Sequence, residues 1–158
     1  MNQMESLTAF IEENMPPRAM QMFLSAMDDC ELIRSEKGIG LGQRRIGILR
    51  YSVVLVWDDF PYRICPPARL YALVLCWVKE HANALRDELK LPDPVVDPEF
   101  NDDGTASIQV TVVVADEIIL RPAESGAVPL NGQRWDVVYP ELWTAEEGEV
   151  FTRSEGQS

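Results

Sequence analysis

The sequence predicts an α+β fold, in which a mixed or antiparallel sheet of about four to five strands is covered by a long buried helix and by short N-terminal helices. Three observations support this prediction. Residues 95–120 read as two strands joined by a tight turn, residues 44–57 read as another long strand, and residues 66–78 repeat apolar side chains at helical spacing. Because a hairpin alone is unstable in water, residues 95–120 should form the inner pair of a larger sheet with a helix packed across it.

The turn within residues 95–120 is expected at Asp103 and Gly104, since glycine adopts a positive φ at little cost and aspartate tolerates one. In the strand that follows, one set of alternate residues is wholly apolar: Ile108, Val110, Val112 and Val114. The intervening set starts polar and becomes apolar from Val113 onward. The second half of this strand should therefore be covered on both faces.

Two short helices are expected at the N-terminus. The first has an apolar face of Met4, Leu7, Phe10 and Ile11. It ends near Asn14, because the residues before Pro16 and Pro17 are disfavoured in helical angles. The second starts at Pro17 and has apolar residues at i, i+3, i+4 and i+7: Met20, Phe23, Leu24 and Met27. All six methionines lie within the first 27 residues. They either fill irregular gaps between helix and sheet or form an adaptable docking surface for another chain.

Residues 30–35 read as a brief strand that leads into a glycine-rich segment, with Gly38, Gly40 and Gly42 at alternate positions. A phosphate-binding loop is not indicated, since the spacing differs and no Lys-Ser or Lys-Thr follows. The segment over residues 36–43 is instead predicted to be a mobile hairpin loop. Residues 44–57 then alternate between two apolar faces, as expected of a central strand.

The main helix should begin after Pro66 and Pro67. Its apolar stripe comprises Leu70, Leu73, Val74, Trp77 and Val78, and it is widened by Tyr71, Leu75 and Cys76. A helix that is apolar around most of its circumference is normally buried. This helix is therefore predicted to cover one face of the sheet.

The chain after the main helix is less regular. Residues 82–89 should form a kinked or separate helical turn, and Asn131-Gly132 predicts a small hairpin or a bulged edge strand within residues 128–139. The sequence thus predicts one domain over residues 1–140, followed by an acidic, flexible tail over residues 141–158. Trp143 and Phe151 in that tail would anchor either to a neighbouring subunit or to their own domain.

Catalytic, metal and cofactor sites are not indicated. The chain has one histidine and three widely spaced cysteines, which suit reduced, mostly buried thiols better than a zinc site with its close ligand pairs. Asp58-Asp59 reads as a solvated turn, and residues 99–104 mimic the start of a calcium loop whose required glutamate is replaced by Val110. We therefore expect neither an enzyme nor a protein that binds a metal or cofactor.

The net charge of −12, from 26 acidic and 14 basic residues, argues against specific nucleic-acid binding, because such a surface repels phosphates. The longest apolar run in a helical stretch, residues 70–78, is too short to span a bilayer. The first fifteen residues contain no Lys or Arg, unlike the start of a secretory signal. A chain that acts without a membrane, with cytosolic thiols, is expected.

Three stretches resemble the tail completion protein R (GpR) family of contractile-tailed, peduovirus-type bacteriophages. They are RYSVVLVWDDFPYRI, a β-rich run ending in an acidic turn; PARLYALVLCWVKEHAN, a helix with its tryptophan near the end; and EFNDDGTASIQVTVVVADEIIL, a hairpin followed by a long regular strand. The order of helices and strands is similar too, and the resemblance extends over residues 44–120 and more loosely beyond.

The resemblance implies a tail-terminator-like fold and a structural role at the tail–neck junction of the virion, after assembly in the host bacterial cytoplasm. Such a protein caps the tail tube and sheath as a ring, expected to be a hexamer, and takes part in head–tail joining with a neck or head completion protein. A closed ring requires two different complementary patches on each subunit. Mobile loops and tails can supply them, so the candidate subunit or partner contacts are Gly38, Gly40, Gly42, Arg44, Trp143 and Phe151.

Two other classes stay open. A neck or stopper protein, or an assembly factor absent from the finished particle, would share the same surroundings. An acidic interaction protein that inhibits by mimicking nucleic acid is less favoured, because its carboxylates should stand at phosphate-like spacing, whereas the Asp-Asp pairs here occupy predicted turns.

Overall fold

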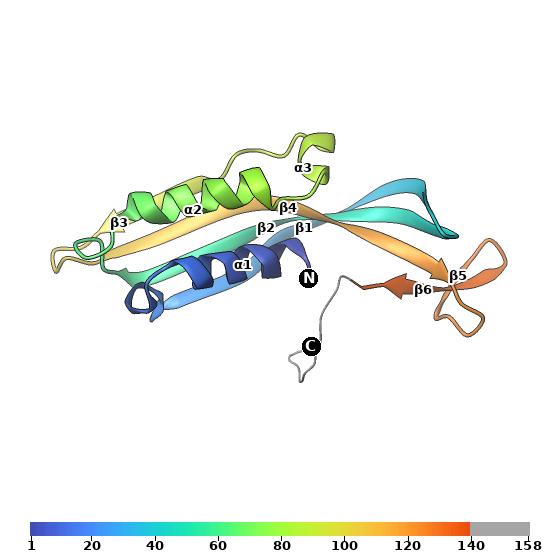
Figure 1. Ribbon diagram of the computed structural model, residues 1–158, viewed down its shortest axis with the longest axis horizontal. Coiled ribbons are helices and arrows are strands. Elements are labelled where there is room, and N and C mark those ends of the chain that lie inside the picture. The colour runs from blue at the N-terminus through green and yellow to red at the C-terminus, as the bar shows by residue number, and fades with distance from the viewer. Residues whose placement is uncertain (140–158) are drawn as a thin grey trace. The chain divides into compact units, whose positions relative to one another are not determined.

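The computed structural model describes residues 1–139, and its six strands form one sheet in the order β1-β2-β4-β6-β5, with β3 paired to another part of β4 (Figure 1). The elements have these bounds: α1 Gln3–Asn14, a 3₁₀ turn Pro17–Met20, β1 Phe23–Gly40, β2 Gln43–Phe60, α2 Pro67–Glu80, α3 Leu85–Glu88, β3 Val95–Phe100, β4 Ala106–Pro122, β5 Val128–Leu130 and β6 Gln133–Val138. The pairs β3–β4, β4–β6 and β5–β6 are antiparallel. The predicted α+β class is confirmed, with six strands instead of four to five.

The chain forms two compact units. Unit 1 consists of Met1–Asn2, Arg34–Gly47 and Glu117–Ser158, and unit 2 consists of Gln3–Ile33 and Ile48–Asp116. Strands β1, β2 and β4 each contribute residues to both units. The division into a domain over residues 1–140 and a tail stays a prediction, because residues 140–158 lie outside the described part.

The core of unit 2 is built on alternate residues of two central strands. The buried residues of β2 on this face are Tyr51, Val53, Leu55 and Trp57, and those of β4 are Ile108, Val110, Val112 and Val114. This is the set that strict alternation predicts, since every second side chain of a strand points to the same face.

Helices α1 and α2 cover this face of unit 2 and contact each other (Figure 1). Helix α1 contributes buried Leu7 and Ile11, and the indole Nε1 of Trp77 in α2 donates to Ser6 Oγ in α1 at 3.0 Å. The prediction of a buried main helix is wrong in extent. Only Leu70, Val74 and Trp77 of α2 are buried, and Leu75 is 57% exposed, because the sheet covers just one side of the helix.

The second predicted helix, through Met20 to Met27, is also wrong. A 3₁₀ turn starts at Pro17 as the proline suggests, but β1 begins at Phe23 and continues for 18 residues. Phe23 packs on Trp57 with ring centroids 4.8 Å apart, and Ser25 Oγ hydrogen-bonds Thr8 Oγ1 at 3.0 Å. Pairing with β2 and these contacts outweigh a helical spacing that involves only four apolar residues.

The methionines divide between buried and exposed positions, and the predicted docking role stays a prediction. Met4, Met15 and Met20 pack in or against the core of unit 2, whereas Met22, just before β1, and Met27, on β1, are exposed. The cysteines also differ from expectation, since Cys65 is buried but Cys30 and Cys76 are exposed. Both results have one cause: β1 is the outermost strand of the sheet and α2 is buried on one side only.

The hairpin β3–β4 forms with the predicted acidic turn, and Gly104 there has a φ of 84°. It is not an inner pair of the sheet, because β3 pairs only with β4 and all its residues are exposed. Strand β4 alone is central, and its register with β3 runs from Val95–Thr111 to Phe100–Ala106.

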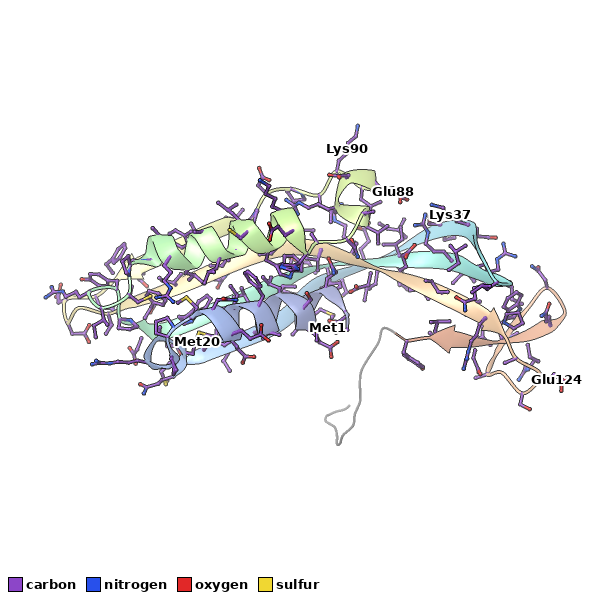
Figure 2. All side chains as sticks on the ribbon, in the orientation of Figure 1. Met1, Met20, Lys37, Glu88, Lys90 and Glu124 are labelled. Carbon is purple, nitrogen blue, oxygen red and sulfur yellow. The ribbon has the colours of Figure 1, made fainter. Side chains whose placement is uncertain are left out.

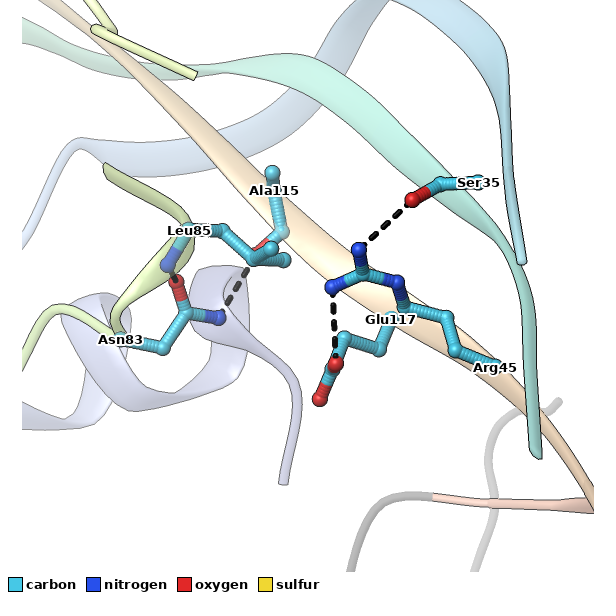
Figure 3. Close-up of polar contacts among 6 residues, drawn as sticks. All are labelled: Ser35, Arg45, Asn83, Leu85, Ala115 and Glu117. Atoms are coloured by element: carbon cyan, nitrogen blue, oxygen red, sulfur yellow. Dashed lines mark hydrogen bonds and ion pairs between the residues drawn. The ribbon is translucent and has the colours of Figure 1, made fainter. Parts of the chain in front are cut away.

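The segment after α2 packs on the other face of β4 within unit 2. The side-chain amide of Asn83 donates to the carbonyl of Ala115 at 2.8 Å, and its Oδ1 accepts from the amide of Leu85 (Figure 3). Leu85 and Leu91 then pack with Ile48 and Ala115. The short α3 confirms the predicted helical turn, and the buried Ala115 confirms that β4 is covered on both faces at this point.

In unit 1, β5 and β6 form the predicted Asn-Gly hairpin, with φ values of 55° at Asn131 and 71° at Gly132. Buried Trp135 of β6 donates from its indole nitrogen to the carbonyl of Leu130 at 3.0 Å. A side chain at Gly126 would lie 2.2 Å from the Trp135 carbonyl oxygen, so only glycine fits there.

Candidate partner-contact site

The turn between β1 and β2 has an unusual backbone. Three consecutive residues have positive φ: Gly40 at 94°, Leu41 at 57° and Gly42 at 74°. Glycine adopts such angles freely, but in a leucine the Cβ crowds the backbone. The turn is therefore strained at Leu41.

Leu41 is also almost fully exposed, at 96% of its accessible surface. Its neighbour Ile39 is exposed as well, and Gly42 leaves room for Pro122 of β4, whose ring lies 3.6 Å from the position that a Cβ would take. A large apolar side chain at a strained, solvated turn stabilises nothing within its own chain. It is the kind of feature that contact with another molecule explains.

The hairpin behind this turn is held firmly. Arg45 of β2, whose side chain is only 5% exposed, donates to Ser35 Oγ of β1 at 2.6 Å and to Glu117 Oε2 of β4 at 3.1 Å (Figure 3). One buried guanidinium thus ties three strands together. Nearer the surface, Arg44 pairs with Glu36 at 2.9 Å. Leu41 therefore stands at the end of a braced hairpin, and the predicted mobile loop over residues 36–43 is wrong: only Leu41 and Gly42 lie outside the strands.

The predicted contact residues are partly brought together. Gly38, Gly40, Gly42 and Arg44 all lie in this hairpin end, while Trp143 and Phe151 lie outside the described residues. Their role as contacts stays a prediction. Sequence reasoning missed Leu41, although a large apolar residue between two glycines was a usable signal.

Charge is divided unevenly between the units. The described residues of unit 1 contain six basic and four acidic side chains, a net charge of +2. Unit 2 contains seven basic and seventeen acidic side chains, a net charge of −10. With residues 140–158 included, unit 1 carries seven basic and nine acidic side chains, a net charge of −2. Its positive charge is concentrated in the hairpin, where Arg34–Gly47 contain four basic side chains and one acidic, among them exposed Lys37 (Figure 2).

The most strongly perturbed ionisable groups lie elsewhere, in unit 2. Tyr51 donates from its hydroxyl to Asp116 Oδ2 at 2.5 Å, and the backbone amides of Gln3 and Met4 donate to Asp116 and to the Tyr51 oxygen. Burial raises the pKa of the Tyr51 hydroxyl, and the Asp116 carboxylate raises it further. Burial also raises the pKa of Asp116 above its ordinary value, although the Tyr51 and Gln3 hydrogen bonds oppose this.

This network fixes the start of α1 and offers no evident chemistry. Its groups are already satisfied by one another, and a general base needs a free position toward a substrate. Within residues 1–139, no group of three His, Cys, Asp or Glu side chains could hold a metal ion. No helix in that range is long and apolar enough to cross a membrane.

Comparison with known proteins identifies the family. The model of the P2 phage tail completion protein R (GpR) family matches residues 1–139. A protein of Haemophilus phage HP1, described as an uncharacterized 19.2 kDa protein in the rep-hol intergenic region, is 26% identical over 151 residues, which is 96% of this chain and 90% of that protein. No solved structure matches the chain. A match over the whole described fold, beyond the three stretches that resemble the family, shows that the chain belongs to the P2 phage tail completion protein R (GpR) family.

Proposed function

We propose that this chain is a structural component of a contractile-tailed phage virion that terminates the tail. Several copies close a ring over the end of the tail tube and sheath, stop further polymerisation, and present a surface to the neck or head completion protein. The observation on which the proposal rests is the family match over residues 1–139, which makes the chain one of the phage tail completion proteins.

Features of both units support a role in binding. Unit 2 is built around a large buried core, and the buried Tyr51 and Asp116 are paired with each other. Unit 1 presents Leu41, a strained apolar side chain whose exposure suits a contact with another subunit. A subunit with such a contact can build an assembly at the tail–neck junction, with the tube, sheath and neck proteins as partners.

The proposal is tested in phage that lacks the gene, complemented with the wild-type gene as control. Without the protein, we expect tails whose tubes vary in length and heads that are separate from tails in electron micrographs. Antibody labelling of complemented particles should mark the tail–neck junction. Tubes of normal length firmly joined to heads would reject the proposal.

The same particles distinguish the neighbouring possibilities. A neck or stopper protein would leave tube length normal and impair only head joining. An assembly factor would be required for both but missing from the protein content of purified virions.

A further inference from the structure

Part of one face of the sheet in unit 2 is uncovered within the described chain. Helices α1 and α2 lie on the opposite face, and the segment after α2 covers only the region around Ile48 and Ala115. Away from that region, alternate residues of β1, β2 and β3 that point away from α1 and α2 stay accessible. We call this surface the open face, and it includes Leu24, Val54, Val56, Val95, Asp97 and Glu99. Leu24 and Val95 are 67% and 63% exposed.

The open face combines apolar and acidic groups. On β3, Val95, Asp97 and Glu99 stand opposite Thr111, Gln109 and Ser107 of β4, so their side chains share that face. Asp97, Glu99 and Val56 line a groove of about 400 Å³. A partner for this surface should therefore present an apolar side chain beside a positive charge.

The end of the β1–β2 hairpin in unit 1 has these properties. It presents Leu41, and Lys37 lies on the same hairpin (Figure 2), whose residues Arg34–Gly47 have a net charge of +3, whereas the open face belongs to a unit of net charge −10. The two surfaces are different and complementary. Contacts of this head-to-tail kind produce rings when the rotation between copies closes.

Pairing of sheet edges is a poorer means of joining copies. On the β3 edge, the backbone amide of Asn101 donates to the Thr105 carbonyl, and alternate residues bond to β4 in the same way: Glu99, Asp97 and Val95. The backbone of Pro98 therefore faces outward. Because proline has no N–H, it offers no donor to an added strand there. On the other edge, Asp29 has a φ of 52° within β1, as at a bulge. Both edges thus carry features that discourage strand addition.

We propose that the Leu41 end of one copy docks on the open face of a second copy, with Leu41 against Val54, Val56 and Val95 and with Lys37 near the carboxylates of Asp97 and Glu99. This inference rests on the proposed self-assembly and specifies its surfaces. Burial of Leu41 would offset the strain of its backbone, and the charges would make association sensitive to salt.

Leu41→Gly is the first test. Glycine accepts the positive φ without strain, so this variant should fold at least as stably as wild type while lacking the apolar side chain. We expect its self-association, measured by sedimentation velocity of the full chain alone and with isolated tail tubes, to weaken by about ten- to a hundredfold, the range expected for loss of one buried leucine. Leu75→Ala, at an exposed position on α2, is the matched control and should associate as wild type.

A charge exchange tests the partner surface. Lys37→Glu should weaken association most at low salt, and so should the double variant Asp97→Lys and Glu99→Lys, whereas Lys79→Glu on α2 should not. Combining Lys37→Glu with the double variant should restore association, because the opposite charges again face each other.

Each outcome of these experiments supports or contradicts the inference. Wild-type association by Leu41→Gly, or failure of the combined variant to recover, overturns the inference while leaving the ring intact. Rings of Leu41→Gly that form normally but no longer bind tail tubes would assign the tip to the tube protein instead. A wild-type chain that never assembles, even on tubes, would contradict the proposed function itself.

Discussion

At the scale of single residues, the Tyr51–Asp116 pair fixes the beginning of α1. Asp116 accepts from the Tyr51 hydroxyl at 2.5 Å and from the Gln3 amide at 3.1 Å, so it satisfies one of the unpaired N–H groups that every helix start has. Such an acceptor at a helix N-terminus is normally next to the helix in sequence. Here it comes from β4, 113 residues away. No local sequence pattern could have revealed it.

The raised pKa of Asp116 gives this pair a defined pH dependence. A carboxyl whose pKa is higher in the folded state binds its proton more tightly when the chain is folded. Its contribution to the free energy of unfolding is therefore greatest at low pH, and it falls as the pH rises from the ordinary pKa of 3.8 through the raised pKa of the folded state. Asp116→Asn removes this titration. The loss of free energy of unfolding caused by Asp116→Asn should therefore be larger below that window than above it.

Urea unfolding at several pH values, with an Asp103→Asn control, measures the difference. Asp103 lies in the exposed turn before β4, where the Thr105 hydrogen bonds lower its pKa, so the control should show the opposite trend with pH. A cost of Asp116→Asn that rises with pH would contradict the assignment.

Arg45 and Arg44 are adjacent in sequence but differ in burial and partners. Arg45→Met leaves Ser35 and Glu117 without the guanidinium that they bind, and we expect it to lower the free energy of unfolding by about 1–3 kcal/mol. The loss is limited because the Glu117 side chain is 37% exposed, so water can partly replace the lost partner. Arg44→Met breaks an exposed pair with Glu36 and should cost less than about 1 kcal/mol. Thermal unfolding of both variants measures the two losses of stability. Equal losses for Arg45→Met and Arg44→Met would show that Arg45 does not brace the hairpin.

At the scale of helices and strands, the elements predicted best are those whose signal is local. The turns at Gly104 and at Asn131-Gly132 form as predicted because their residues accept positive φ, which few others do. The alternation in residues 44–57 and 108–114 identifies the two central strands, since both are fixed by burial on the helix side. A sequence pattern that depends only on residues within one turn or strand can be recognised without knowing which elements pack beside it.

The wrong predictions concern elements whose environment is set by distant segments. Residues 23–27 have a helical spacing of apolar side chains, but β2 supplies a ladder that only the folded chain provides. Helix α2 is apolar on most sides, yet Leu75 and Cys76 face solvent, because nothing in the described chain packs there. Apolar composition therefore overstated the burial of α2.

This one-sided burial of α2 leads to a prediction at the same scale. Trp77→Ala removes a fully buried indole and its hydrogen bond to Ser6, and it should lower the free energy of unfolding by about 3–5 kcal/mol. Leu75→Ala, two residues earlier on the exposed side, should change it by no more than about 0.5 kcal/mol. Denaturant unfolding compares them, and a large loss for Leu75→Ala in the isolated subunit would mean that α2 is covered after all.

At the scale of the whole molecule, the candidate site was only half predictable. The glycines and Arg44 could be proposed from sequence because glycine-rich hairpin ends are recognisable. The division of charge could not be predicted from sequence, because each unit is assembled from separate segments of the chain, and ten of the twelve net negative charges belong to unit 2. Only the fold shows which acidic residues belong together.

That division of charge supports a final prediction about DNA. If the assembled ring surrounds the path of the phage genome, the seventeen acidic residues of unit 2 should keep phosphates from adhering, because binding would require several basic side chains to displace counterions. The purified assembly should therefore not be retained on double-stranded DNA at moderate salt.

An electrophoretic shift assay from low to moderate salt tests this, with an unrelated basic DNA-binding protein as the positive control. The wild-type protein should leave DNA mobility unchanged throughout, whereas the control should shift it at low salt. Retention of the wild-type assembly at moderate salt would contradict the prediction. Capture of a basic protein by a chain that stays monomeric would instead favour an acidic inhibitor, because a terminator must assemble in order to act.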